Sequence, residues 1–92
     1  MKLEFLWGSK RSSLDIFESI LGSLSESQLK KTHVTYKANL DSRLASKYLR
    51  ALLQLSMIAK STNDPSYYII TPKGRNFLEQ YRGLIKTVEL KI

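Results

Sequence analysis

The change in hydrophobic period after Ser56 is the feature that most constrains the fold of this chain. Between Ser12 and Ser56, apolar residues recur at intervals of three and four, which is typical of α-helices. After it come two short runs rich in β-forming residues, at 57–60 and 67–70, on either side of the turn-forming segment 61–66. This arrangement predicts a β-hairpin, and the helical interval returns after Thr71-Pro72. The expected fold class is therefore mainly α with a small β-hairpin.

The first and last helices carry clear start signals. The first is predicted from Ser12 or Ser13 to about Leu24, because Ser12 is a favourable N-cap and Asp15 falls in the first turn. The last begins at Thr71-Pro72, since Thr is favoured at the N-cap and Pro at the first helical position.

Two further helices are predicted between them, at about 29–38 and 42–55, separated by the break Asn39-Leu40-Asp41. Asn tolerates a left-handed or turn conformation, and Asp41 can cap the helix that follows. Val34 and Ala38 are expected to face the core. The inner positions of the helix at 42–55 are predicted to be Leu44, Ala45, Tyr48, Leu49, Leu52 and Leu53.

Positive charge is concentrated in one part of the chain. The net charge is +7 over 92 residues, and five of these seven units lie between Lys30 and Arg50, where six basic residues accompany a single acid, Asp41. Such a concentration indicates a polyanionic partner, which would be nucleic acid or an anionic membrane surface. No apolar run reaches the roughly 18–20 residues of a membrane span, and the N-terminus lacks the pattern of a signal peptide. We therefore expect a cytoplasmic, nucleoid-associated protein.

The composition also excludes several kinds of chemistry. The absence of cysteine excludes a disulfide scaffold, a zinc finger and a thiol nucleophile. The lone histidine, His33, has no partners for catalysis or metal binding, so we expect a surface or helix-packing role for it. No acid/base pair, nucleophile constellation or phosphate loop is visible. We therefore expect a protein that is not an enzyme and that has no cofactor, metal site or evident small-molecule ligand.

The order helix, helix, short break, basic helix, hairpin, helix matches a winged helix-turn-helix domain. In that geometry the second helix of the pair enters the DNA major groove and the first crosses the backbone. The predicted organisation is an N-terminal arm (1–11), a winged helix-turn-helix domain (12–71) and a C-terminal helix (72–92) for dimerisation. The expected function is sequence-dependent binding of double-stranded DNA by a homodimer, as a transcriptional regulator.

Each group of candidate site residues has a functional interpretation and a plainer one. The base-reading candidates, which could instead be a solvated helix face, are Ser42, Arg43, Ser46, Lys47 and Arg50. The phosphate-contact candidates, which could serve solubility alone, are Lys10, Arg11, Lys30, Lys31, Lys37 and Lys60. The dimerisation candidates, which could instead cover the domain's own core, are Leu78, Tyr81, Ile85, Val88 and Ile92. Two tyrosines, Tyr36 and Tyr48, are expected to be core aromatics, with base stacking as the alternative.

Several segments resemble archaeal winged-helix proteins, which are small transcriptional regulators related to the dimeric ten-kilodalton chromatin proteins of hyperthermophilic archaea. The matching segments are 10–12, 30–40 with its Tyr-Lys-Ala-Asn-Leu core, 47–49, 68–74 with its Thr-x-Lys-Gly, and 77–79. The resemblance covers about residues 10–90. It implies an archaeal DNA-binding protein that dimerises through its last helix.

One departure from this family concerns the end of the basic helix. The family has Gly-Leu-Ile there, and glycine provides the left-handed residue that ends a helix. Here the segment is Ser56-Met57-Ile58, so the helix must end on a costlier Ser or in a different turn.

Two alternatives to a site-specific regulator remain open. One is a chromatin-type protein that binds DNA through charge without sequence preference. The other is a protein-interaction module built on the winged-helix scaffold, since a fold does not fix a function.

Overall fold

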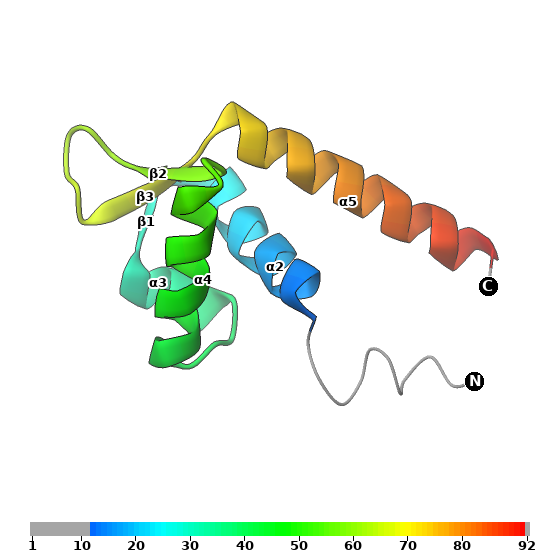
Figure 1. The fold of residues 1–92 in the computed structure, drawn as a ribbon, viewed down its shortest axis with the longest axis horizontal. Helices are drawn as coiled ribbons and strands as arrows, with labels where there is room; N and C mark the ends of the chain where they lie inside the picture. The colour runs from blue at the N-terminus through cyan, green and yellow to red at the C-terminus, as the bar shows by residue number, and fades with distance from the viewer. Residues whose placement is uncertain (1–11, 92) are drawn as a thin grey trace.

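The computed structural model describes residues 12–91, which form four helices and three short strands (Figure 1). In chain order the elements are α2 (Ser13–Glu26), β1 (Leu29–Lys30), α3 (Lys31–Lys37), α4 (Ser42–Gln54), β2 (Ile58–Lys60), β3 (Tyr67–Ile70) and α5 (Pro72–Lys91). Helices α2, α3 and α4 pack together beside the sheet, and α5 runs from the sheet past α2 (Figure 1). The predicted order of helices and hairpin is confirmed. The arm predicted at 1–11 lies outside the described residues.

The predicted helix starts are confirmed by their capping hydrogen bonds. Ser12 Oγ accepts from the amide of Asp15 at 3.1 Å, and Asp41 Oδ1 accepts from the amide of Leu44 at 2.8 Å. Thr71 Oγ1 likewise accepts from the amide three residues further on, at 3.1 Å. Each bond satisfies a backbone N–H that has no partner within its own helix.

The sheet contains one strand more than predicted. Its order is β1-β3-β2 and both pairs are antiparallel, with Leu29 opposite Tyr68 and Ile58 opposite Ile70. The hairpin of β2 and β3 is confirmed, but the prediction that the second helix begins at Leu29 is wrong. Leu29 and Lys30 pair with β3, and the helix starts only at Lys31. A two-residue strand is too short to show an alternating pattern, and its pairing partner lies far along the chain.

Within residues 12–91, two residues other than glycine adopt left-handed backbone conformations, at the ends of α3 and α4. Asn39 has φ of 56° in the break between these helices, as its side chain type allows. Ser56 has φ of 62°, two residues after the end of α4. The chain therefore makes this left-handed turn on a serine, which is the costlier of the two helix ends expected from the sequence.

The core lies between the three packed helices, the sheet and the first half of α5. Its largest fully buried side chains are Ile20, Leu21, Val34, Leu49, Leu52 and Ile58. Burying each such side chain contributes about 1.5–3 kcal/mol to folding. Tyr48 is a core aromatic as predicted, at 8% exposed, whereas the same prediction for Tyr36 is wrong because that side chain is 86% exposed. Helix α3 has only seven residues and turns Val34 inward, which leaves Tyr36 on its outer face.

Candidate nucleic-acid interface

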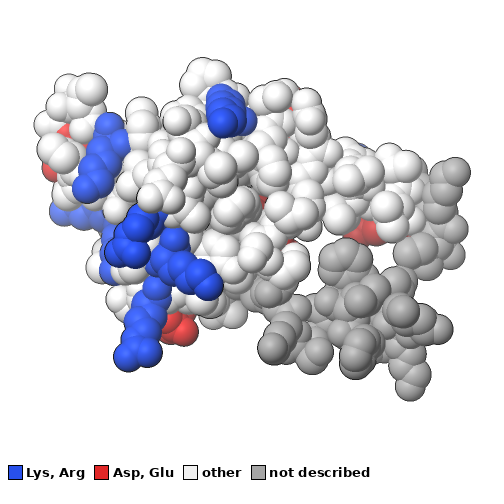
Figure 2. Space-filling model, in the orientation of Figure 1, with Lys and Arg blue, Asp and Glu red and all other residues white. Residues whose placement is uncertain are grey.

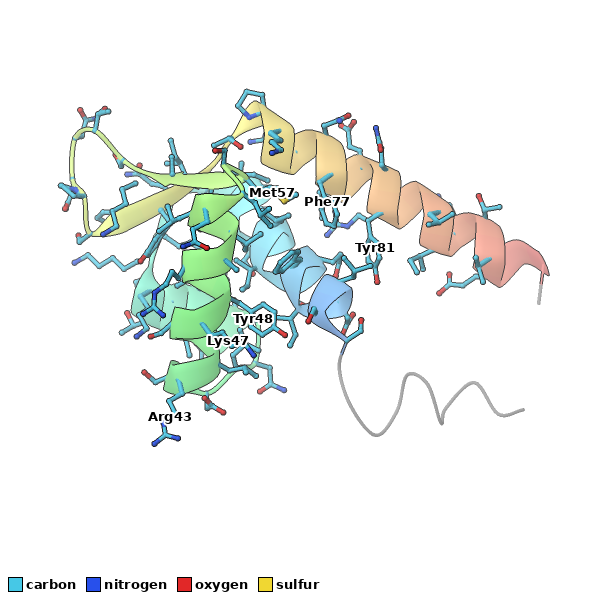
Figure 3. The ribbon with its side chains drawn as sticks, in the orientation of Figure 1. Arg43, Lys47, Tyr48, Met57, Phe77 and Tyr81 are labelled. Carbon is cyan, nitrogen blue, oxygen red and sulfur yellow. The ribbon has the colours of Figure 1, made fainter. Side chains whose placement is uncertain are left out.

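A stripe of basic side chains runs along the outer face of α4. Arg43, Lys47 and Arg50 are all exposed and follow one another at intervals of four and three, so they share one side of the helix. Figure 2 shows Lys and Arg gathered over the end of the molecule that contains α4 and the hairpin. In Figure 3, Arg43 points away from the body of the domain. These three predicted site residues are therefore presented together to solvent.

The opposite face of α4 is fixed to the rest of the domain. Tyr48 places its hydroxyl 2.9 Å from Ser13 Oγ at the start of α2, and its ring meets that of Phe17 edge-on with centroids 5.7 Å apart. Lys47 Nζ lies 5.6 Å from the centroid of the Tyr48 ring, in cation–π range. Because its inner side is held in this way, α4 presents the basic stripe from a rigid support.

The two serines among the base-reading candidates differ in position. Ser42 is exposed as the first residue of α4. Ser46 is half-buried, and its Oγ accepts a hydrogen bond from Lys31 Nζ at the start of α3. Ser46 therefore joins α4 to α3 and lies at the edge of the exposed stripe.

The phosphate-contact candidates lie on different sides of the molecule. Lys31 and Lys60 line one hollow together with Arg50. Lys30 lies on β1 with its Nζ 5.4 Å from the centroid of the Tyr67 ring. Lys37 lies 3.9 Å from Glu26 of α2 and lines a separate hollow that also includes Arg82 of α5. Lys10 and Arg11 fall outside the described residues.

The loop between β2 and β3 is an ordered turn with an acidic residue near its tip. Asp64 Oδ1 accepts from the hydroxyl of Ser66 at 2.7 Å and from its amide at 3.0 Å. These hydrogen bonds, led by the hydroxyl, hold the pKa of Asp64 below its ordinary value. The loop of the hairpin thus carries a carboxylate that stays ionised, and Lys60 is the last residue of β2, where the strand meets this loop.

The dimerisation candidates on α5 differ in how far the chain itself buries them. Leu78 is 4% exposed and belongs to the core, so the structure removes it from the residues free to contact a second chain. Tyr81 and Ile85 are half-buried and Val88 is 43% exposed, while Ile92 lies outside the described residues.

An apolar hollow of about 410 Å³ lies between α2 and α5. Its lining residues are Leu14, Phe77, Gln80, Tyr81 and Leu84. Leu14 is 47% exposed and Leu84 is 62% exposed. In Figure 3, the side chains of Phe77 and Tyr81 lie on the side of α5 that faces α2. The spacing of apolar residues along α5 did not single out Leu84, because this residue falls between the predicted dimerisation candidates Tyr81 and Ile85. Its exposure next to Leu14 could be seen only once the two helices were placed side by side.

Within residues 12–91 no group of three or more metal-ligating side chains is placed to hold a metal ion. Among the helices of the same residues, none is long and apolar enough to cross a membrane.

Comparison with known proteins identifies relatives in sequence and in structure. A family model described as winged helix-turn-helix matches residues 10–89. The DNA-binding protein Sso10a-2 of Sulfolobus solfataricus is 31% identical, with a TM-score of 0.74, over 86% of this chain and 83% of that one. An uncharacterized protein of Methanocaldococcus jannaschii is 33% identical over 79 residues, which are 86% of this chain but only 36% of that protein. A mutant form of MepR from S. aureus shares the fold at 17% identity, with a TM-score of 0.71 over 84% of this chain and 61% of its own.

Proposed function

The chain belongs to the winged helix-turn-helix family, and on this premise we propose that it binds double-stranded DNA as a homodimer and regulates transcription. Helix α4 enters the major groove, and the protein acts at the nucleoid. The observation that carries this proposal is the stripe of Arg43, Lys47 and Arg50 on the exposed side of a helix whose other side is anchored by Tyr48. A helix used in this way needs an exposed basic face and a fixed orientation.

The residues of the stripe have different roles in this proposal. Arg43 reads base edges, since it lies in the first turn of α4, points into solvent and has a fork that matches the major-groove edge of guanine. Lys47 follows one turn later on the same side and can reach either a base or a phosphate. Lys31 and Lys60 contact the phosphate backbone, which fixes the position of the protein without reading sequence. Lys37 has a smaller role because Glu26 already lies beside it.

The proposed dimer uses the apolar face formed by α2 and α5. Leu14, Leu84 and Val88 are large apolar side chains left exposed by a single chain, and Leu14 and Leu84 line the same hollow. A two-fold axis through this face pairs the same surface on both copies. If both copies engage one face of the duplex, their α4 helices lie about 34 Å apart or at a multiple of that distance. The DNA-binding relative Sso10a-2 supports the proposed partner.

A fluorescence-anisotropy titration of labelled duplex DNA, repeated at several salt concentrations, tests the proposal. The affinity should fall by about 0.9 log units per log unit of salt for each phosphate contact. Arg43→Glu and Lys47→Glu should weaken binding strongly. Lys73→Glu is the matched control, because it makes the same charge change at an exposed position of α5. Binding no tighter than that of a neutral protein, or equal loss in all three variants, would contradict the proposal.

Selection from a random DNA pool separates a site-specific regulator from a general chromatin protein. We expect an enriched motif, because the arginine fork of Arg43 discriminates guanine from the other bases. A pool that is retained without enrichment would favour the chromatin-type function.

A further inference from the structure

A second basic feature lies beside the α4 stripe, in a hollow of about 270 Å³ where α3, α4 and the hairpin meet. Three cationic side chains line it, and each comes from a different element: Lys31 from α3, Arg50 from α4 and Lys60 from β2. No carboxylate from residues 12–91 lines the hollow. The other lining residues are Ser46, Leu49, Leu53 and Tyr68.

The convergence of three cations is electrostatically unfavourable in the free protein. Like charges repel, and they do so more strongly in a concave site flanked by apolar side chains than in open water. The ion pairs found within the described part of the chain use Lys37 and Arg82, so they do not neutralise this site. Lys31 is also held in place, because its Nζ donates to Ser46 Oγ. The site therefore has a fixed cation, two further cations within reach and no anion from the described residues.

A phosphate group suits this arrangement of donors. It offers several oxygens to donors that approach from different directions, and a guanidinium fork can bind two of them at once. The two lysines supply point charges from the α3 side and the hairpin side. The hydroxyl of Ser46 stands among them as a further polar group.

The location of the hollow indicates where that phosphate comes from. Arg50 belongs to the same exposed side of α4 as Arg43 and Lys47, so the hollow lies next to the surface that faces DNA in the proposed function. We propose that the hollow seats one phosphodiester group of the DNA backbone, held by Arg50, Lys31 and Lys60. This inference rests on the proposed function and deepens it.

The proposal changes the role expected for Arg50. The sequence pattern placed Arg50 with the base-reading candidates, but here it binds the backbone. A phosphate held between α4 and the end of β2 also sets the depth of α4 in the groove. Base reading is then left to Arg43 and Lys47, which do not line the hollow.

Two matched variants separate the two roles. Arg50→Ala should weaken binding to all duplexes by a similar factor and lower the salt slope by up to about 0.9. Arg43→Ala removes the same side chain from the same face of α4 outside the hollow, and should change the relative affinity for different sequences. Arg50→Lys should recover part of the lost affinity, because it restores the charge without the fork. If Arg50→Ala relaxes sequence preference as Arg43→Ala does, the assignment of Arg50 to the backbone is overturned.

A direct test titrates the DNA-free protein with inorganic phosphate and follows amide chemical shifts by NMR, with ionic strength held constant by chloride. We expect saturable shifts at Ser46, Arg50 and Lys60 that disappear in Arg50→Ala and are reversed when duplex DNA is added. A protein that binds DNA but shows no such shifts overturns the inference and leaves the proposed function standing. Phosphate that stays bound in the presence of saturating duplex overturns the assignment to the DNA backbone. If phosphate binds and no duplex does, both the inference and the proposed function are contradicted.

Discussion

The phenolic oxygen of Tyr48 lies 2.9 Å from Ser13 Oγ, and this contact joins the middle of α4 to the first turn of α2. One residue earlier on α4, Lys47 faces solvent. The same turn of helix therefore carries both an anchor and a candidate DNA contact. The orientation of the basic stripe depends on this packing.

Removal of the Tyr48 hydroxyl tests the contribution of this contact to stability. We expect Tyr48→Phe to lower the free energy of unfolding by about 0.5–1.5 kcal/mol, the usual net contribution of one hydrogen bond. Ser13→Ala should have a similar effect, and urea denaturation of both single variants and the double variant measures the coupling. Fully additive losses would show that the two hydroxyls do not stabilise each other.

Gly74 lies where α5 crosses the segment after α4. A Cβ at this position would overlap the carbonyl oxygen of Met57, which is backbone and cannot move aside cheaply. Gly74→Ala should therefore lower the free energy of unfolding by about 1–3 kcal/mol or more, as overpacking does. Gly83 on the same helix has open space around it, so Gly83→Ala should raise stability by about 0.5–1 kcal/mol. Thermal unfolding of the pair would contradict this account if both variants changed stability in the same direction.

At the left-handed serine after α4, replacement by glycine should raise stability. Ser56 has φ of 62°, a conformation that glycine adopts without the steric cost of a Cβ. Ser56→Gly should raise the free energy of unfolding by about 0.5–1 kcal/mol, net of the greater freedom of glycine in the unfolded chain. Ser56→Ala keeps a Cβ and should bring no gain. A loss of stability in Ser56→Gly, measured by urea denaturation, would show that this turn is not strained.

A charge placed in the apolar hollow tests the proposed dimer. Leu84 is 62% exposed and lines the hollow between α2 and α5. Leu84→Lys should convert the dimer to a monomer in multi-angle light scattering, because burial of an unpaired ammonium is strongly unfavourable. Thr62→Lys introduces the same side chain at an exposed position of the loop between β2 and β3, away from α5, and is the control. A wild-type mass of a single chain at micromolar concentration would contradict the proposed dimer.

The ionisation of Tyr81 should make the stability of the protein depend on pH above neutrality. Burial, followed by the nearby carboxylates of Asp15 and Glu18, raises the pKa of Tyr81 above its ordinary value. The folded state then keeps the proton at pH values where the unfolded state loses it. Stability should therefore fall as the pH rises above about 10, the ordinary pKa of tyrosine. Urea denaturation across this range should show a smaller fall for Tyr81→Phe, and equal falls in both proteins would exclude this cause.

Local signals in the sequence predicted those parts of the fold that depend on neighbouring residues. The caps of Ser12, Asp41 and Thr71 act within three residues of the cap, so their helix starts were predicted correctly. Strand β1 was missed because it exists only by pairing with Tyr67 and Tyr68, far along the chain. Tyr36 was placed in the core for a related reason. A helix of one or two turns gives too few apolar positions to show which side is inner.

The same limit applies to the candidate site. The spacing of Arg43, Lys47 and Arg50 predicted a shared exposed face, because helical periodicity alone determines it. The hollow that combines Arg50 with Lys60 depends on how the hairpin folds back against α4, which no local pattern encodes. For Leu78, the local pattern predicted a contact that the packing of the chain does not leave available. The spacing of Leu78 on α5 is typical of a residue that contacts a second chain, but the packing of α5 on the core buries Leu78 within its own chain.

Chemical-shift mapping with duplex DNA tests the central claim, that α4 is the helix which enters DNA, most directly. An amide-resolved NMR titration should show the largest changes along residues 42–50 and near Lys60, where β2 meets the hairpin loop. The exposed face of α5 around Lys73 should change little. Changes concentrated on α2 and α5, with α4 unaffected at saturating DNA, would contradict the account.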